Sequence, residues 1–229
     1  QRAGDGRGVE GLFLDGENQR ARVEAVVAER VGRRAPPLRE ALRVASVEGE
    51  VFTAEVVAQI RGCGDDVMME YLSGDLDRRH HLVRAHSIIR IDGRLLSRYR
   101  FRHIQIQKYL YSSLDEVERV HLHKRAGSIL ENLYGGQDEA AAIAPQLARH
   151  FQEAGITHKA ILYLQQDGER ALQLSAYQEA VAHLSDSLSL LGTQPESGDR
   201  AALEVDLQLA LGRAWLSKGL PAMEMEAAY

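Results

Sequence analysis

The chain has 229 residues, 45% of them hydrophobic, and a formal net charge of −5 at pH 7. This length can bury the core of one large domain or two small ones, and the acidic balance argues against a general nucleic-acid-binding protein, which would carry a basic excess. The single cysteine excludes a disulfide framework and a thiolate metal cluster, so we expect a cytoplasmic protein. No apolar run approaches the ~20 residues of a membrane span, and we expect no membrane partner.

The first part of the chain predicts a linker followed by helices. Residues 1–19 are rich in glycine and charge and have no period, which is typical of a loop or linker. Apolar residues then recur at helical spacing. They predict helices over about 18–32, from Pro36 through Ala45, after Thr53 as N-cap, and over 65–84, where Met68, Leu72, Leu76 and Val83 share one phase.

Two β-rich runs follow, on either side of Asp92-Gly93. This pair suits a tight hairpin turn because both positions tolerate a positive φ angle. Helices followed by a hairpin are the order of elements in a winged helix-turn-helix. We therefore expect a winged-helix domain over residues 20–113, with the hairpin as its wing.

The stretch YRFRHIQIQKYLY changes its period at a histidine. Strand alternation places Tyr99, Phe101 and His103 on one side, and the same histidine begins a helix with Ile106 and Leu110 at i+3 and i+7. Both patterns predict that the imidazole faces inward. A helix N-terminus has free N–H groups and the positive end of the helix dipole, which can receive a phosphate. On spacing alone, a hydrogen-bonded interior histidine is the simpler interpretation.

After residue 113 nearly every segment has a helical pattern. Asp115 is the predicted N-cap of a helix that ends before Gly135, with an apolar stripe made of Val117, Val120, Ala126, Ile129, Leu130 and Leu133. Further helices are predicted over about 138–154, 158–174, 177–191 and 199–218, and from 221 onward. Because the chain begins without methionine and ends inside a predicted helix, we expect it to be a segment of a longer protein.

A degenerate helical repeat is the second pattern in this half. Tetratricopeptide repeats place small residues where paired helices touch and aromatic or leucine residues between them. The residues in matching phase are Ala148, Phe151, Gly155, Ala160, Gly168, Ala180, Gly212 and Trp215. The helix over 158–174 must serve as second helix of one unit and first helix of the next. We therefore expect a mainly α protein, a winged helix followed by a tetratricopeptide-like α-superhelix over 114–229 that continues beyond Tyr229.

Motifs for independent catalysis are absent from the sequence. There is no G-x-x-x-x-G-K-[ST], G-x-S-x-G or H-E-x-x-H, and no paired-cysteine zinc spacing. His121 and His123 are two positions apart on a predicted helix, so their side chains diverge and do not favour a shared metal. We expect no catalytic residue, metal site or cofactor in this segment, and therefore no enzymatic activity of its own.

A basic stretch runs from the third predicted helix through the wing. It contains Arg78, Arg79, Arg84, Arg90, Arg94, Arg98, Arg100 and Arg102, against only Asp77 and Asp92. In other winged helices these elements touch DNA, so nucleic acid is one partner to consider. A solvated or acid-paired face is the favoured interpretation, because the rest of the chain is acidic enough to supply partners.

Three stretches together resemble the bacterial STAND class of signal-transduction ATPases. They are LREALRVASVEGEVFTAEVV from Leu38, YRFRHIQIQKYLYSSLDEVER from Tyr99, and LARHFQEAGITHKAILYLQQDGERAL from Leu147. In that class an AAA-type ATPase domain precedes a winged helix, and a tetratricopeptide-like superhelix follows it. Some members also carry a nucleotide cyclase domain or a LuxR-type DNA-binding domain.

The resemblance implies a nucleotide-sensing role for one histidine. In related ATPases a winged-helix histidine contacts the β-phosphate of bound ADP, and Phe101-Arg102-His103 matches that motif. His103 is therefore the expected sensor, with Arg102 and Arg100 as helpers, whereas Ile106 departs from the aromatic residue that relatives usually have. ATP or ADP would be held by an upstream ATPase domain in cis, and the P-loop would lie in that domain.

The function expected from the sequence is regulatory. The winged helix would sense the nucleotide state, and the repeats would bind an unknown partner protein or small-molecule inducer. The alternative from another class is a DNA-binding winged-helix transcription regulator with a helical-repeat effector region. A third alternative is a plain scaffold of helical repeats.

Overall fold

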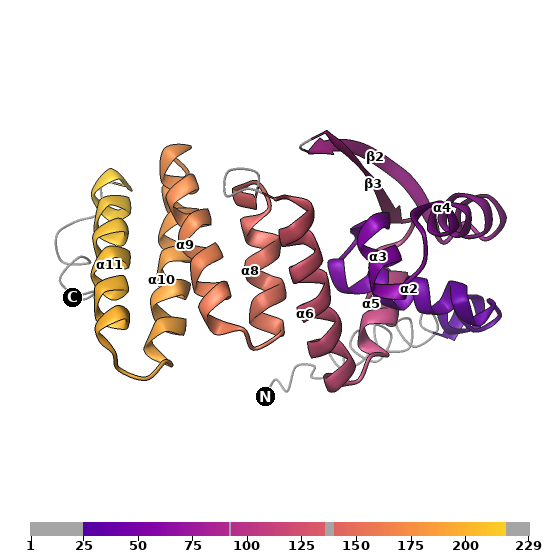
Figure 1. Ribbon diagram of the computed structural model, residues 1–229, viewed down its shortest axis with the longest axis horizontal. Helices are drawn as coiled ribbons and strands as arrows, with labels where there is room; N and C mark the ends of the chain where they lie inside the picture. Colours follow the sequence, from indigo (N-terminus) through magenta and orange to yellow (C-terminus); the bar gives the residue numbers. More distant parts are fainter. Residues whose placement is uncertain (1–24, 92, 136–139, 219–229) are drawn as a thin grey trace, which may run out of the picture. The chain divides into compact units, whose positions relative to one another are not determined.

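The computed structural model describes residues 25–91, 93–135 and 140–218. It is mainly helical with one small three-stranded antiparallel sheet (Figure 1). Contacts divide the chain into two compact units. Unit 1 comprises Gln1–Ile89 with Leu95–Asp115, and unit 2 comprises Arg90–Arg94 with Glu116–Tyr229. The predicted linker over 1–19, the start of the helix over 18–32 and the helix from 221 lie outside the described residues.

Unit 1 contains short helices and the sheet, except for Arg90–Arg94 at the end of the hairpin, which belong to unit 2. Residues 25–32 are helical, and the elements that follow are α2 (Pro36–Glu48), β1 (Val51–Thr53), α3 (Ala54–Arg61), α4 (Asp65–Met69), the π-helix η1 (Glu70–Arg79), β2 (Val83–Ile91), β3 (Arg94–Phe101) and α5 (Ile104–Ser112). A proline begins α2, where its missing N–H costs no hydrogen bond. Gly62 ends α3 at φ 67°, a left-handed angle that glycine adopts without strain.

The sheet joins a strand that the sequence analysis did not predict to the predicted hairpin. The strand order is β1-β3-β2, and β1 pairs antiparallel with β3, with Phe52 opposite Tyr99. The Phe52 ring lies 6.2 Å from the Tyr99 ring and 5.1 Å from the Phe101 ring, between centroids. All three are buried. The strand β1 has three residues, too few for a period to reveal it.

The third predicted helix is shorter than expected and changes its winding. The α-helix ends at Met69 and continues as a π-helix to Arg79, so the prediction of a helix over 65–84 is wrong at its end. His81 then takes φ 51°, and Val83 begins strand β2. Leu72 and Leu76 are fully buried, as their phase predicted, whereas Val83 is buried from a strand. Val83, seven positions after Leu76, is a single apolar residue, and one residue cannot distinguish a continuing helix from a new strand.

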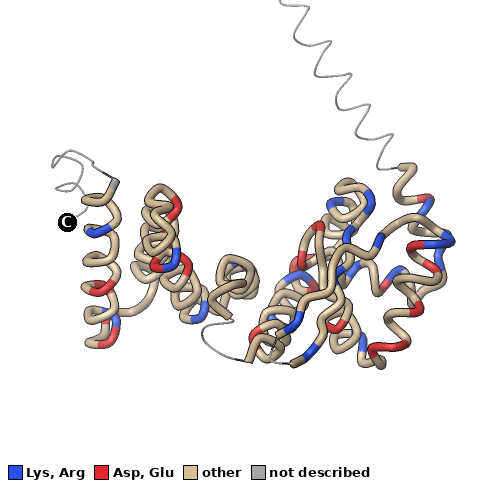
Figure 2. Tube along the Cα trace, turned by 90° about the horizontal axis from the view of Figure 1, so that it is seen from above, with Lys and Arg blue, Asp and Glu red and all other residues tan. Residues whose placement is uncertain are grey.

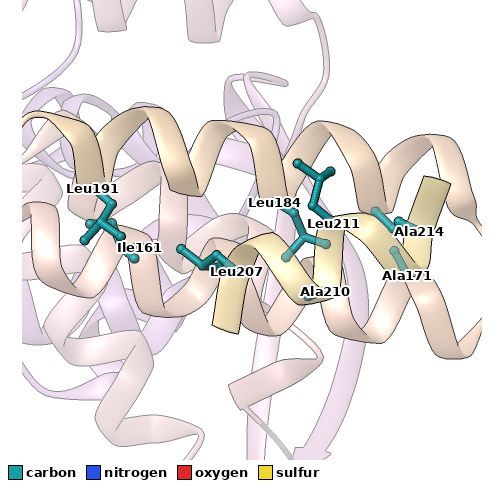
Figure 3. Packing of buried hydrophobic residues seen from close by; sticks show 9 residues of the cluster. Ile161, Ala171, Leu184, Leu191, Leu207, Ala210, Leu211 and Ala214 are labelled. Atoms are coloured by element: carbon teal, nitrogen blue, oxygen red, sulfur yellow. The ribbon is translucent and has the colours of Figure 1, made fainter. Parts of the chain in front are cut away.

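Unit 2 is a series of helices that reverse direction along the chain (Figure 1). They are α6 (Glu116–Leu133), α8 (Ala144–Glu153), α9 (Thr157–Gln173), α10 (Tyr177–Gly192) and α11 (Gly198–Lys218). Each packs most extensively against its neighbours in sequence. A buried cluster joins α9, α10 and α11 through leucine, isoleucine and alanine side chains (Figure 3).

Two glycines allow helices of unit 2 to approach closely. A Cβ atom at Gly168 in α9 would lie 2.7 Å from Cγ of Leu184 in α10, and one at Gly127 in α6 would lie 3.2 Å from atoms of His150 and Phe151 in α8. The predicted stripe on α6 is only partly correct. Val117 and Val120 are exposed, whereas Ala126, Leu130 and Leu133 are buried.

In the parts of the chain that the structure describes, no helix has the length and apolar character needed to cross a membrane.

Candidate functional site

His103 lies between the sheet and the helix that the sequence analysis predicted. It is the N-cap residue of α5, with φ −137° and ψ 130°, and its side chain is exposed. The prediction that the imidazole faces inward is therefore wrong. Strand β3 ends at Phe101, so the alternation that buries Tyr99 and Phe101 stops before it reaches His103.

The position of His103 exposes anion-binding groups. Its side chain makes no capping hydrogen bond to α5, and among the described residues its imidazole has no hydrogen-bond partner. The first N–H groups of a helix have no partner inside the helix, and here they lie beside an exposed imidazole. The positive end of the helix dipole favours a phosphate at this point.

The two predicted helper arginines are already paired with carboxylates. Arg102 donates from Nη2 to Oδ1 of Asp77 at 2.7 Å, and Arg100 donates from Nη2 to Oε1 of Glu50 at 2.7 Å. Nε of Arg100 donates to the same Glu50 oxygen at 2.8 Å. The structure thus places His103, Arg102 and Arg100 at one strand end, but only the histidine is free to take a ligand without breaking an ion pair.

Other arginines of the basic stretch differ in their partners. Arg79 pairs with Asp75 at 2.8 Å. Within the described residues, no ion pair or hydrogen bond from the side chain is formed by Arg78, Arg84, Arg90 or Arg94. Acidic and basic residues are interspersed along the elements of unit 1 (Figure 2). The acid-paired interpretation therefore holds for part of the stretch, whereas Arg84, Arg90 and Arg94 of the hairpin have no side-chain partner among the described residues.

The residues predicted to pack the repeat lie mostly at helix contacts. Ala148, Phe151, Ala160 and Ala180 are buried, and Gly168 is the close-contact glycine described above. Gly155 lies just after the end of α8 and has φ 67°. Trp215 is partly buried against the cluster of α9, α10 and α11.

A buried histidine pair is a feature that the sequence analysis missed. His123 in α6 and His150 in α8 are fully buried, and their Nδ1 atoms lie 3.0 Å apart. Burial lowers the pKa of His123 to about 4 and that of His150 to about 3, with further lowering by nearby cationic groups. Both rings are therefore neutral at pH 7, and one Nδ1–H donates to the other Nδ1. Their separation of 27 positions in the sequence hides this pairing from any local pattern.

A second cluster links α6 to α9. Glu131 accepts hydrogen bonds from Nζ of Lys159 at 2.5 Å and from the hydroxyl of Tyr163 at 2.8 Å. Nζ of Lys159 lies 4.9 Å from the centroid of the Phe151 ring, which stacks on Tyr163. Burial and the Glu131 carboxylate raise the pKa of Tyr163. These contacts are structural, and no group of three or more metal-ligating side chains occurs among the described residues.

Comparisons with known proteins place the chain in no family. No family model matches it, and no solved structure matches it. A protein of Rhizobium meliloti (strain 1021), described as uncharacterized, is 33% identical over 125 residues. The match covers 54% of this chain but only 12% of that protein, so the chain corresponds to a small part of a much longer relative.

Proposed function

We propose that the chain is the regulatory and interaction segment of a STAND-type signal-transduction ATPase. Unit 1 is a winged helix that senses the nucleotide state of an upstream ATPase domain. Unit 2 is a tetratricopeptide-like array that binds a partner protein or inducer. The segment itself is not an enzyme and carries no cofactor, and ATP or ADP belongs to the ATPase domain in cis.

The topology of unit 1 supports the winged-helix part of this proposal. The element order is helix α2, strand β1, helix α3, helix α4 with η1, and then the hairpin of β2 and β3. The sheet order β1-β3-β2 puts the short first strand beside the second strand of the hairpin. A winged helix has this order of elements, with the hairpin as its wing.

The helix contacts of unit 2 support the repeat part. In a tetratricopeptide array, small residues stand where successive helices touch. Gly168 of α9 and Ala180 of α10 lie at such a contact, together with Leu184. The stacking of each helix on its sequence neighbours is the arrangement of a solenoid, whose surface is used for binding.

The observation that carries the sensing role is the exposed His103 at the N-terminus of α5. Its imidazole and the free N–H groups beside it can bind a phosphate from outside unit 1. Arg102 and Arg100 act as positioning residues, because their pairs with Asp77 and Glu50 anchor the chain on both sides of the strand end. A ligand bound by two domains biases a two-state rotation between them.

The variant His103→Ala is expected to reduce the ADP that remains bound to the full-length protein by about tenfold, because one charge-assisted hydrogen bond to phosphate is lost. Basal activity of the ATPase is expected to rise. The measurement is the ADP content of purified protein by chromatography. His86→Ala is the matched control, since His86 is another exposed histidine of unit 1. Equal ADP occupancy in wild type and His103→Ala would exclude the sensing role.

The DNA-binding alternative has one favourable observation and one unfavourable one. Arg84, Arg90 and Arg94 of the hairpin, which have no side-chain partner in the described parts of the chain, can contact phosphates. However, the third helix, which would enter the major groove, carries five acidic residues: Asp65, Asp66, Glu70, Asp75 and Asp77. Asp75 and Asp77 pair with Arg79 and Arg102, but Asp65, Asp66 and Glu70 are exposed, and their negative charge opposes binding to DNA phosphates.

We expect binding to duplex DNA to be weak and to fall little with salt. A protein that contacts phosphates shows a steep negative slope of log K against log salt, about −0.9 for each phosphate contact. Fluorescence anisotropy with a labelled duplex measures this slope, and the triple variant of Arg84, Arg90 and Arg94 to alanine is the control. A steep slope that this variant abolishes would favour the DNA-binding function over the sensing role.

A further inference from the structure

A cleft of about 470 Å³ lies on unit 2 between α9, the start of α10 and the end of α11. It is lined by Glu169, Leu172, Gln173, Tyr177, Arg213 and Ser217. The cleft is as large as sites that hold small ligands or a few peptide residues. Leu172 also packs against the buried cluster shown in Figure 3, so one wall of the cleft belongs to the rigid part of the unit.

Among the described residues, the Arg213 side chain has no partner, in contrast to the other described lysine and arginine side chains of α9, α10 and α11. Lys159 pairs with Glu131, Arg170 donates to the backbone oxygen of Ala141, and Arg200 donates to that of Gln194. Among the described lysine and arginine side chains of α9, α10 and α11, only Arg213 forms no hydrogen bond or ion pair. Its guanidinium therefore has all its donors available at the cleft.

The remaining wall residues supply a mixed set of polar groups. Within the described residues, the hydroxyls of Tyr177 and Ser217 and the side-chain amide of Gln173 make no hydrogen bond. Glu169 accepts one hydrogen bond, from Nε2 of Gln165 at 3.0 Å, and its carboxylate can accept others. The cleft thus contains the cationic guanidinium of Arg213, neutral donors from hydroxyl and amide groups, and the Glu169 carboxylate as an acceptor.

We propose that this cleft binds an extended peptide segment of a partner protein that carries an acidic side chain. The carboxylate pairs with Arg213, because a guanidinium matches a carboxylate with two parallel hydrogen bonds. A peptide N–H group donates to Glu169, and an apolar side chain packs on Leu172 and the Tyr177 ring. A peptide fits better than a simple anion, because a simple anion has no donor for the Glu169 carboxylate. The inference rests on the proposed role of unit 2 in binding partners.

The experiment uses the ¹⁵N-labelled chain and follows the amide resonances of Gln173, Tyr177 and Arg213. The probe is an acetylated and amidated tetrapeptide, Ala-Leu-Asp-Ala, titrated to about 10 mM because millimolar affinity is expected for so short a ligand. We expect saturable shifts at these resonances. Arg213→Gln is expected to weaken binding about tenfold, whereas Lys124→Gln, which alters an exposed cation of α6, leaves it unchanged.

Two further probes distinguish the source of the carboxylate. The Ala-Leu-Asn-Ala peptide, capped in the same way, should bind about tenfold more weakly. A peptide Ala-Leu-Ala-Ala with a free C-terminus should bind no better than the asparagine peptide. Equal binding of either probe, absence of shifts with the aspartate peptide, or full binding by Arg213→Gln would overturn the proposal.

The nucleotide-sensing role is tested independently of the peptide site. His103→Ala should leave peptide binding unchanged, because His103 belongs to unit 1. Loss of ADP in that variant together with absence of peptide shifts would overturn the peptide site and keep the sensing role. Peptide binding with unchanged ADP occupancy would give the opposite result.

Discussion

Replacing Gly168 by alanine is expected to lower the free energy of unfolding of unit 2 by about 2 kcal/mol. The added Cβ atom would lie 2.7 Å from Cγ and 2.9 Å from Cδ2 of Leu184, which is fully buried and cannot move into solvent. At an unobstructed position inside a helix, the same substitution would raise stability by about 0.5–1 kcal/mol. Urea unfolding followed by the fluorescence of Trp215, the only tryptophan, reports on this region.

Gly192→Ala is the matched control, because nothing lies within 4 Å of the Cβ atom it adds. We expect this variant to be as stable as wild type or slightly more stable. A double-mutant cycle with Leu184→Ala identifies the clash. Leu184→Ala alone should cost about 2–5 kcal/mol, and in that background Gly168→Ala should cost nothing, since the new methyl group enters the vacated space. Additive losses would show that the clash with Leu184 is not the cause.

The buried histidine pair is expected to make unit 2 less stable as the pH falls below about 6.5. The folded-state pKa values of His123 and His150 are about 4 and about 3, below the usual 6.5. Between these values the unfolded state binds more protons than the folded state, so stability increases with pH and is lost on acidification. The loss is on the order of 2–3 kcal/mol for each histidine at pH 4.5.

The physical cause is the burial of the pair, which penalises the charged form of each imidazole, together with positive charge nearby. The two rings face each other with Nδ1 atoms 3.0 Å apart, so a proton on each ring would place two cations in contact. Arg149 and Arg119 add to the repulsion. Nε2 of His150 is buried and has no hydrogen-bond partner among the described residues.

The measurement is the free energy of unfolding from urea denaturation at intervals between pH 7 and pH 4. The double variant His123→Leu/His150→Leu replaces both rings by apolar side chains of similar size. Its pH slope should be smaller by up to about 3 kcal/mol per pH unit, the value for two protons. His121→Gln, at an exposed histidine of the same helix, should retain the wild-type slope. Equal slopes in the double variant and wild type would contradict the predicted titration.

Much of the helical part of the fold follows from local patterns in the sequence. The i, i+3, i+4 spacing of apolar residues predicted α2, because a helix with one buried face requires that period. Helical patterns between loop signals predicted α3, α9, α10 and α11. Asp92-Gly93 predicted the hairpin, and Gly93 takes φ 78° as a tight turn requires. Gly168 and Ala180 were identified as contact residues because close helices need small side chains.

Patterns at the ends of elements were less informative. His103 satisfied two periods, but it is the N-cap between a strand and a helix and follows neither, so its side chain is exposed. Val83 satisfied a helical phase and is buried in a strand. Where one element gives way to another, the backbone turns, and a period extrapolated past the turn no longer predicts a direction.

The tertiary structure alone decided which distant groups meet. His123 and His150 are 27 residues apart, and Arg100 and Glu50 are 50 apart. Such pairs depend on how whole elements pack, and a window of sequence contains no information about that packing. Local patterns in the sequence predicted most of the helices and the hairpin. Only the packed structure showed that the imidazole of His103 is exposed and has no partner among the described residues, that Arg100 and Arg102 are paired, and that Arg213 lines a cleft.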